Sequence, residues 1–195
     1  MDIKELIART RSYRRFDQSH HIDTVILKNL IDLARLSASA ANRQPLKYLI
    51  FNQSFDCDRI FPCLAWAGYL KDWAGPVKGE RPPAYIIILG DKAVTESFGV
   101  DHGIAAQSIM LGASGAGLGG CMIASIKKED LRNELLIPGQ YEILLLLALG
   151  KPVEKVVIEV IKNDDVKYWR DKNGTHHVPK RTIDDIILDP KSFNE

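Results

Sequence analysis

A dense group of arginines lies near the start of the chain, in the sequence Arg-Thr-Arg-Ser-Tyr-Arg-Arg-Phe from Arg9 to Phe16. Four guanidinium groups occur within seven positions, Ser12 lies among them, and the first acidic residue after them is Asp17. A guanidinium is permanently charged, and its fork of N–H donors fits the oxygens of a phosphate. The cluster therefore predicts an anion-binding segment. The alternative is a solvated basic run that follows a helix and complements its dipole.

A second segment without acidic residues, 37–45, reads Ser-Ala-Ser-Ala-Ala-Asn-Arg-Gln-Pro. Small side chains allow a ligand to approach the backbone, and Ser39, Asn42 and Gln44 offer hydrogen-bonding groups. A plain loop that ends at a proline is the alternative, but it does not account for the richness in Ala, Ser, Asn and Gln. We expect this loop to contribute to a ligand site.

A third segment is the glycine-rich run from Gly115 to Gly120, which is followed by the apolar stretch 121–124. A dinucleotide-binding fold requires a strand, a glycine turn and then a helix. Here a helix precedes the glycines and a strand follows them, so we reject that interpretation and expect the glycines to end the helix and permit close packing. Ser125 is the predicted N-cap of a helix over 127–136, and the turn before that helix would offer backbone N–H groups to a ligand.

Two pairs of residues near the C-terminus could also bind a ligand. The basic pair Lys180-Arg181 could add positive charge to an anion site. The pair His176-His177 suggests a metal, but adjacent strand residues point to opposite faces and a third ligand is missing, so no metal site is predicted. Because the chain has no catalytic-triad context, paired-carboxylate motif or P-loop, we predict no catalytic side chain and expect a cofactor to supply any enzyme chemistry.

The composition is that of an ordinary soluble protein, with 46% hydrophobic and 26% charged residues, and we expect one domain over residues 1–195. A net charge of only +1 argues against a general nucleic-acid-binding function. Three cysteines without a Cys-x-x-Cys motif argue against a disulfide framework or a zinc site. The first nine residues lack an apolar signal core, and the longest apolar run, 143–149, is too short to span a bilayer, so we expect a cytoplasmic protein.

Hydrophobic periodicity and capping signals predict alternating helices and strands. The predicted helices cover 2–9, 57–65, 98–115, 127–136 and 183–188, and one more helix is predicted to begin after an N-cap at Asp23. The predicted strands cover 47–52, 84–89, 121–124, 142–149 and 156–161. A hairpin is predicted to turn at Asn173-Gly174. The aromatic, Gly/Pro-rich stretch 66–83 predicts either a wall over a flat ligand or a satellite hydrophobic cluster.

These segments together resemble the nitroreductase family of FMN-dependent oxidoreductases over nearly the whole chain. The segment from Arg11 to Phe16 is similar to the family's Arg-Ser-x-Arg-x-Phe motif, and the segment from Ser39 to Pro45 is similar to its Ser-Ala-x-Asn-x-Gln-Pro loop. Residues 101–120 resemble its central helix and Gly-Leu-Gly ending. The chain departs from the family at Thr10, where a basic residue is frequent, and at Leu46, where the family has tryptophan after Gln-Pro. The segment between its first two strands, which helps to shape the family's substrate pocket, is also short.

The resemblance implies an α+β fold, with a mainly antiparallel central sheet flanked by helices, in an intertwined homodimer that binds FMN at its interface. It implies that Arg11 and Ser12 hold the phosphate, that Lys180 or Arg181 closes on it, and that Arg14 lies near flavin N1 and stabilises the reduced anion. The loop 38–42 would come from the other subunit, and 122–125 would line one flavin face and direct a backbone N–H toward N5. The implied cofactor-binding residues are Arg11, Ser12, Tyr13, Arg14, Ala38, Ser39, Ala40, Asn42, Gln44, Met122, Ile123, Ala124, Ser125, Lys180 and Arg181.

The function that this resemblance implies is hydride transfer from NAD(P)H, through flavin N5, to a small oxidised acceptor such as a nitroaromatic compound or a quinone. One alternative is a flavin enzyme of different chemistry on the same scaffold, such as reductive dehalogenation, flavin fragmentation or dehydrogenation. Another is a non-enzymatic flavin-binding module. No membrane or nucleic-acid partner is expected.

Overall fold

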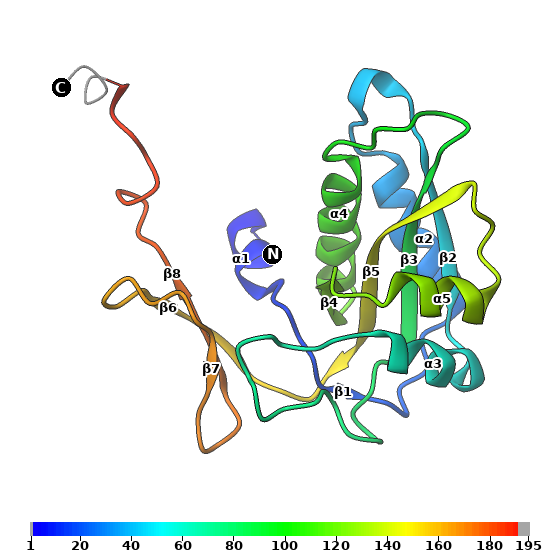
Figure 1. Cartoon of the computed structure of the whole chain (residues 1–195). Helices are drawn as coiled ribbons and strands as arrows, with labels where there is room; N and C mark the ends of the chain where they lie inside the picture. The colour runs from blue at the N-terminus through cyan, green and yellow to red at the C-terminus, as the bar shows by residue number, and fades with distance from the viewer. Residues whose placement is uncertain (1, 191–195) are drawn as a thin grey trace.

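The computed structural model of the chain, which describes residues 2–190, has a central antiparallel sheet with helices packed against it (Figure 1). The strands are β1 (Phe16–Asp17), β2 (Leu46–Phe51), β3 (Ala84–Asp91), β4 (Gly119–Ile123), β5 (Tyr141–Pro152), β6 (Val156–Val160), β7 (Trp169–Arg170) and β8 (His176–Lys180). The helices are α1 (Ile3–Arg9), α2 (Thr24–Arg35), α3 (Ser54–Ile60), α4 (Asp101–Gly115) and α5 (Lys128–Leu135), with short 3₁₀ turns η1 (Ala40–Asn42) and η2 (Phe61–Cys63). The predicted α+β class with a mainly antiparallel sheet is confirmed.

Strand β5 organises the central sheet. One of its edges pairs with β3, which pairs in turn with β2, and all of these pairings are antiparallel. On its opposite edge β5 pairs with β4 over residues 146–150, and its last residues, 151–152, pair with β1. A single 12-residue strand therefore joins both the N-terminal segment and the strand after the glycine run to the sheet.

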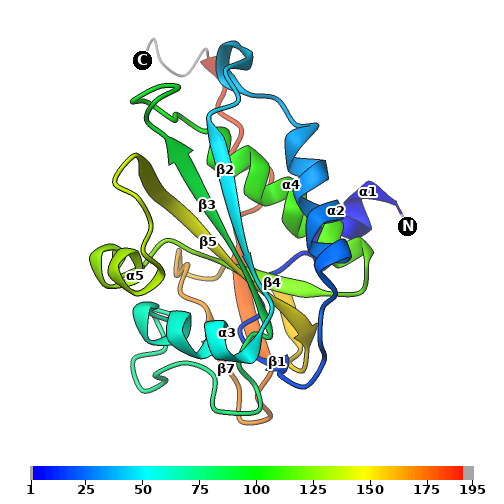
Figure 2. The ribbon, with the colours of Figure 1, turned by 90° about the vertical axis from the view of Figure 1, so that its right-hand side faces the viewer.

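Helices cover both faces of this sheet, with α2 and α4 on one face and α3 and α5 on the other (Figure 2). Leu145, Leu147 and Leu149 pack against the α2–α4 face, while Leu146 and Ala148 pack against the α3–α5 face. This arrangement explains the uninterrupted apolar sequence of β5, because side chains that point to either face of the sheet are buried.

The chain beyond β5 forms a second, three-stranded sheet in which β8 lies between β6 and β7. The pair β6–β8 is parallel and the pair β7–β8 is antiparallel. We call this sheet, from Val156 to Lys180, the C-terminal arm. Figure 1 shows the arm projecting to one side of the central sheet, with the chain after it running further away. The predicted turn at Asn173-Gly174 is confirmed, and Gly174 has the positive φ of 79° that such a turn requires.

Three sequence predictions need correction. Residues 183–188 form a single turn and not a helix, because their apolar side chains find no core to pack against. Lys127, and not Ser125, is the N-cap of α5. Helix α3 begins at Ser54 and ends at Ile60, so the predicted segment 57–65 was placed too late. The cap at Asp23 is confirmed, since its carboxylate accepts a hydrogen bond from the Val25 N–H at 2.8 Å.

Among residues 2–190, no helix is both long enough and apolar enough to cross a lipid bilayer.

The glycines at 119 and 120 lie in β4 rather than at the end of the helix, and Gly119 leaves room for the Tyr13 ring, since a Cβ atom there would lie 2.6 Å from Cδ2 of Tyr13. Ser12 forms a parallel bridge with Gly120, whose carbonyl accepts a hydrogen bond from the Tyr13 N–H at 2.9 Å. A Cβ atom on Gly120 would lie only 2.6 Å from the carbonyl oxygen of Ala148. Because this neighbour is a backbone atom of β5, it cannot move aside without disturbing the sheet.

We therefore expect Gly120→Ala to lower the free energy of unfolding by about 1–3 kcal/mol, as overpacking in a core does. Gly115→Ala is the matched control, because a Cβ atom there meets nothing within 4 Å. The control should change stability by less than about 1 kcal/mol. Urea denaturation of both variants checks this, and equal stabilities would contradict the close packing at Gly120.

Candidate functional site

The arginine cluster leaves α1 and runs along the edge of β4. Helix α1 ends where the Thr10 hydroxyl donates to the Leu6 carbonyl at 2.7 Å. The chain then extends, and the bridge between Ser12 and Gly120 fixes its path. Along this path the Arg14 side chain is buried, while Ser12 stays exposed.

A cavity of about 290 Å³ lies beside this segment, and we call it the arginine cavity. Its lining combines four parts of the chain: the N-terminal segment, α4, β4 and the C-terminal arm. The lining residues are Thr10, Arg11, Ser12, Arg14, Gln107, Met110, Met122, Tyr168, His176, Val178 and Lys180. Five of them were predicted as ligand-binding from sequence, namely Arg11, Ser12, Arg14, Met122 and Lys180. Among the described residues, no acidic side chain lines this cavity.

Arg14 is the most enclosed cation of the cavity, with only 8% of its surface exposed. Its Nη1 donates hydrogen bonds to the Ser12 carbonyl at 3.2 Å and to Nε2 of His176 at 3.1 Å. Its guanidinium carbon lies 4.8 Å from the centre of the Tyr168 ring. All these partners are uncharged, since an Nε2 that accepts from a guanidinium belongs to a neutral imidazole.

The backbone of the same segment is held by a carboxylate that the sequence analysis missed. Glu154, in the connection between β5 and β6, accepts hydrogen bonds from the N–H groups of Arg14 and Arg15 through one oxygen. Its other oxygen accepts from Nη2 of Arg170 at 2.9 Å. The Glu154 side chain has no exposed surface. No local sequence pattern marks a lone acid in a strand connection as a partner of residues so far away.

The other basic side chains have partners elsewhere. Arg15 forms a bidentate ion pair with Glu80, at 2.7 and 2.6 Å. Arg181 forms an ion pair with Asp164 and does not line the arginine cavity. The adjacent Lys180 does line it. The cluster thus divides into cavity-facing cations, Arg11 and Arg14, and a side chain with a structural partner, Arg15.

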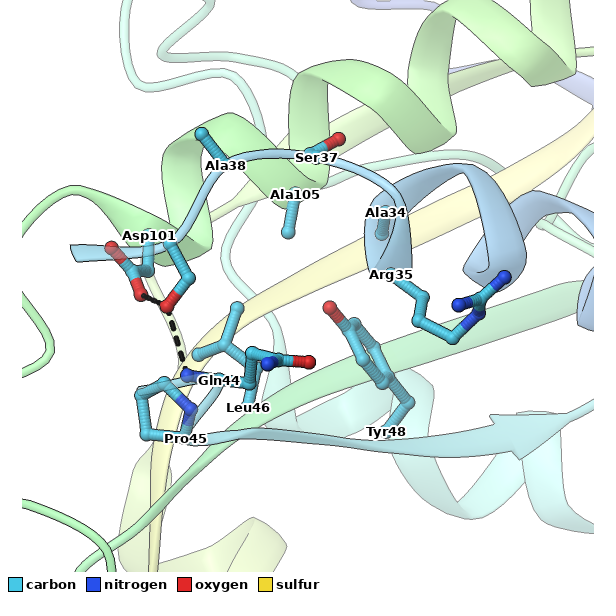
Figure 3. Close-up of a pocket in the computed structure, with 11 residues that line it drawn as sticks. Ala34, Arg35, Ser37, Ala38, Gln44, Pro45, Leu46, Tyr48, Asp101 and Ala105 are labelled. Carbon is cyan, nitrogen blue, oxygen red and sulfur yellow. Dashed lines mark hydrogen bonds between the residues drawn. The ribbon is translucent and has the colours of Figure 1, made fainter. Parts of the chain in front are cut away.

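The small polar loop lies at a different cavity, of about 150 Å³, which Figure 3 shows. Asp101, the first residue of α4, is 4% exposed and holds the loop in place. Its carboxylate accepts from the Ser39 hydroxyl at 2.6 Å and from the Ala40 N–H at 3.0 Å. The Ser39 oxygen in turn accepts from the Gln44 N–H at 2.9 Å. Asp101, like Glu154, is a site residue that sequence reasoning did not find.

This loop has a strained backbone. Ala41, Asn42 and Gln44 have φ values of 51°, 53° and 51°, in the left-handed region that side chains with a Cβ atom rarely adopt. Ala38, Ser39 and Gln44 line the second cavity, while Ala40 and Asn42 form the exposed turn η1. Strain of this kind persists where surrounding contacts fix the loop, and it is commonly found at ligand sites.

The remaining predicted residues are spread over several environments. Met122 lines the arginine cavity, but the Ile123 side chain is part of the core on the α3–α5 face. Ala124 and Ser125 are exposed in the turn after β4, where the Ser125 carbonyl accepts from the Ala65 N–H at 2.9 Å. The Tyr13 ring packs over Gly119, and its hydroxyl donates to the Arg9 carbonyl.

The aromatic stretch 66–83 packs chiefly as a satellite of the core. Trp66 is buried, and Leu70 and Trp73 pack against the same cluster. Tyr69 reaches the arginine cavity indirectly, because its ring lies 4.9 Å from that of Tyr168, which lines the cavity. The cluster alternative is therefore confirmed for this stretch, and Tyr69 joins it to the arm.

The two adjacent histidines of β8 point to opposite faces, as strand geometry requires. His176 faces Arg14, while His177 stacks on Trp169 and contacts Glu159 and Asp171. Burial opposes protonation of His177, but its hydrogen bonds to Glu159 and Asp171 outweigh this and raise its pKa. Burial, followed by the charges of Arg14 and Arg170, lowers the pKa of His176 to about 4.

The lowered pKa of His176 predicts a dependence of stability on pH. Between about pH 6.5 and about 4 the unfolded chain binds a proton at His176 that the folded chain does not, so stability present above pH 6.5 is lost as the pH falls. His176→Gln keeps an acceptor for Arg14 and removes the titration. Urea denaturation at pH 7.0, 5.5 and 4.5 should show a smaller loss for the variant, by up to about 3 kcal/mol. Parallel pH profiles would contradict the burial of a neutral His176.

The chain is similar to known proteins in sequence and in structure. Residues 7–151 match the family model described as "Nitroreductase family". A protein of Methanothermobacter thermautotrophicus, described as "Putative NADH dehydrogenase/NAD(P)H nitroreductase", is 25% identical in an alignment of 161 residues that covers 79% of this chain and 79% of that protein.

Two solved structures share the fold. A nitroreductase family protein from Streptococcus pneumoniae TIGR4 has a TM-score of 0.68 at 15% identity, over 96% of this chain and 100% of that one. A protein from Exiguobacterium sibiricum 255-15, described as "a putative nitroreductase in complex with FMN", has a TM-score of 0.66 at 20% identity, over 78% of this chain and 89% of that one. Since the family match covers most of the chain, from the end of α1 to all but the last residue of β5, the protein belongs to the nitroreductase family.

Proposed function

We propose that this protein is an FMN-dependent oxidoreductase that passes a hydride from NAD(P)H to a small oxidised acceptor, such as a nitroaromatic compound or a quinone. The observation that carries the proposal is the charge of the arginine cavity. Arg11, Arg14 and Lys180 converge on it, and no described acidic side chain in the lining balances them. A phosphate-bearing ligand would supply the missing negative charge.

Unpartnered donors support the same ligand. Nε of Arg11 and Nδ1 of His176 are buried, and neither has a hydrogen-bond partner among the described residues. Burial also lowers the pKa of Arg11, as expected for a cation withdrawn from water without a counter-ion. Because an unsatisfied buried donor costs about 1–3 kcal/mol, a cavity with such donors fits an anionic ligand rich in hydrogen-bond acceptors.

The residues of the cavity suit different parts of FMN. Arg11, Ser12 and Lys180 would hold the phosphate, because their side chains are hydrogen-bond donors that fit phosphate oxygens and are less buried than Arg14. Arg14 would stabilise negative charge on the reduced ring system, since its enclosed guanidinium acts in a low dielectric. Met122 would pack against the flat ring. When bound, FMN would supply the redox chemistry, in which its N5 accepts hydride from NAD(P)H and returns two electrons to the acceptor.

The second half of the site would come from a second copy of the chain. The loop residues Ala38, Ser39, Ala40, Asn42 and Gln44 line or border a cavity separate from the arginine cavity. Apolar side chains that a monomer leaves exposed support a homodimer, and they include Ile104 on α4 and Ile183, Ile186 and Leu188 after the arm. In this arrangement, the polar loop of one protomer would complete the cationic cavity of its partner.

An absorbance spectrum of the purified full-length protein tests the proposal directly. We expect a yellow protein with one FMN per chain, because each chain has one arginine cavity. Anaerobic addition of NADH or NADPH should bleach the flavin absorbance, and an added acceptor should restore it. A protein that is colourless, and stays so after incubation with FMN, would refute the proposal.

The role of Arg14 predicts a specific defect. Arg14→Ala should weaken FMN retention or slow flavin reduction by about tenfold or more, since it removes a charge-assisted interaction from a dry site. Arg15→Ala is the matched control, because Arg15 pairs with Glu80 outside the cavity lining. FMN titration and stopped-flow reduction measure both effects. Unchanged binding and reduction in Arg14→Ala would count against the role assigned to this residue.

A further inference from the structure

The connection between β5 and β6, residues 153–155, contacts both sides of the Arg14–His176 pair. The Val153 N–H donates to the Arg15 carbonyl at 3.0 Å, which fixes the connection beside the N-terminal segment. The Lys155 carbonyl accepts from the His176 N–H at 2.8 Å, which fixes the start of β8. Arg14 and His176 are thus attached to one tripeptide, although neither the main sheet nor the arm alone contains both.

Glu154, the central residue of this tripeptide, makes the most specific contact. One carboxylate oxygen accepts from two consecutive backbone N–H groups, those of Arg14 and Arg15. Because the donors belong to the backbone, the carboxylate fixes the path of the chain and therefore the direction in which the Arg14 side chain leaves it. The Glu154 side chain is fully buried, so solvent cannot substitute for these contacts.

The charge of Glu154 is balanced without using the Arg14 guanidinium. Its second oxygen accepts from Nη2 of Arg170, whose guanidinium lies 4.7 Å from the centre of the Trp73 ring. Arg14, by contrast, has only uncharged partners among the described residues: the Ser12 carbonyl, Nε2 of His176 and the Tyr168 ring. The positive charge of Arg14 is therefore left for a ligand in the cavity, although a carboxylate holds its backbone.

We propose that Glu154 is a positioning residue that acts on the bound cofactor through Arg14. It fixes the Arg14 backbone at the distance from β8 at which the guanidinium meets His176, and Arg170 neutralises its charge so that Arg14 stays available to the ligand. This inference rests on the proposed FMN-dependent function. It concerns which residue sets the electrostatics of the cavity, and not whether FMN binds.

The test uses Glu154→Gln in the full-length, FMN-loaded protein. Glutamine retains one acceptor oxygen, but its amide group places a donor against the Arg170 donor and removes the negative charge. We expect the FMN dissociation constant, measured by fluorescence titration, to rise about tenfold, and the midpoint potential of the bound flavin to become more negative. Glu80→Gln is the matched control, because Glu80 binds the side chain of the adjacent Arg15, and it should change the affinity by less than about twofold.

A double-mutant cycle with Arg14→Ala separates a positioning role from a merely structural one. If Glu154 acts through Arg14, Glu154→Gln should change affinity and potential by less than about twofold in the Arg14→Ala background. Equal losses in both backgrounds would overturn the proposal, and so would an unchanged affinity and potential in the single variant. If Glu154→Gln does not fold, as judged by circular dichroism, the same cycle with Glu154→Asp applies, since aspartate keeps the charge and withdraws the carboxylate from both N–H groups.

These outcomes remain distinct from a failure of the proposed function. A wild-type protein that binds no FMN would refute the function itself. A wild-type protein that binds FMN, together with additive effects in the cycle, would refute only the role of Glu154.

Discussion

The hydrogen bonds between buried carboxylates and backbone N–H groups are the interactions on which the rest of the site depends. Glu154 holds the segment that carries Arg14, and Asp101 holds the loop that carries Ser39 and Gln44. In both places an ionised group lies out of water, where its desolvation is tolerated only if several donors surround it. Each carboxylate meets this condition with backbone donors together with one side-chain donor, Arg170 for Glu154 and Ser39 for Asp101. Because some of the donors belong to the backbone, these hydrogen bonds also fix the path of the chain.

The two halves of the candidate site differ in charge and in backbone conformation. The arginine cavity has a cationic lining assembled from the main sheet and the arm, whereas the loop from Ser37 to Pro45 is polar and adopts a strained backbone. A ligand with an anionic end and a planar, hydrogen-bonding ring needs both kinds of surface. In the proposed homodimer, each surface would be completed by the partner chain, and this would account for the separate lining of the two cavities.

The sequence was informative where a residue type itself carries the chemistry. Arg11, Ser12, Arg14 and Lys180 could be selected because clustered cations with a hydroxyl suggest an anion site, and the structure places all four around one cavity. Glu154 and Asp101 could not be selected, since a single acid has no local pattern and its role depends on contacts across the fold. The apolar spacing at 183–188 was misleading for a related reason. Helical periodicity forms a helix only where a surface is available to bury it, and the described chain provides none there.

The position of β5 also affects how the protein folds as it is synthesised. Arg14 lies 140 positions before Glu154 and 162 before His176, so the N-terminal segment leaves the ribosome roughly 7–32 s before its partners. During that interval β1 has no strand to pair with, because its partner is the last part of β5. Contacts of such high sequence separation form late and slow folding. The arginine cavity is therefore complete only after β8 has been synthesised, and a chain truncated before β8 would keep much of the core but lack part of the cavity lining.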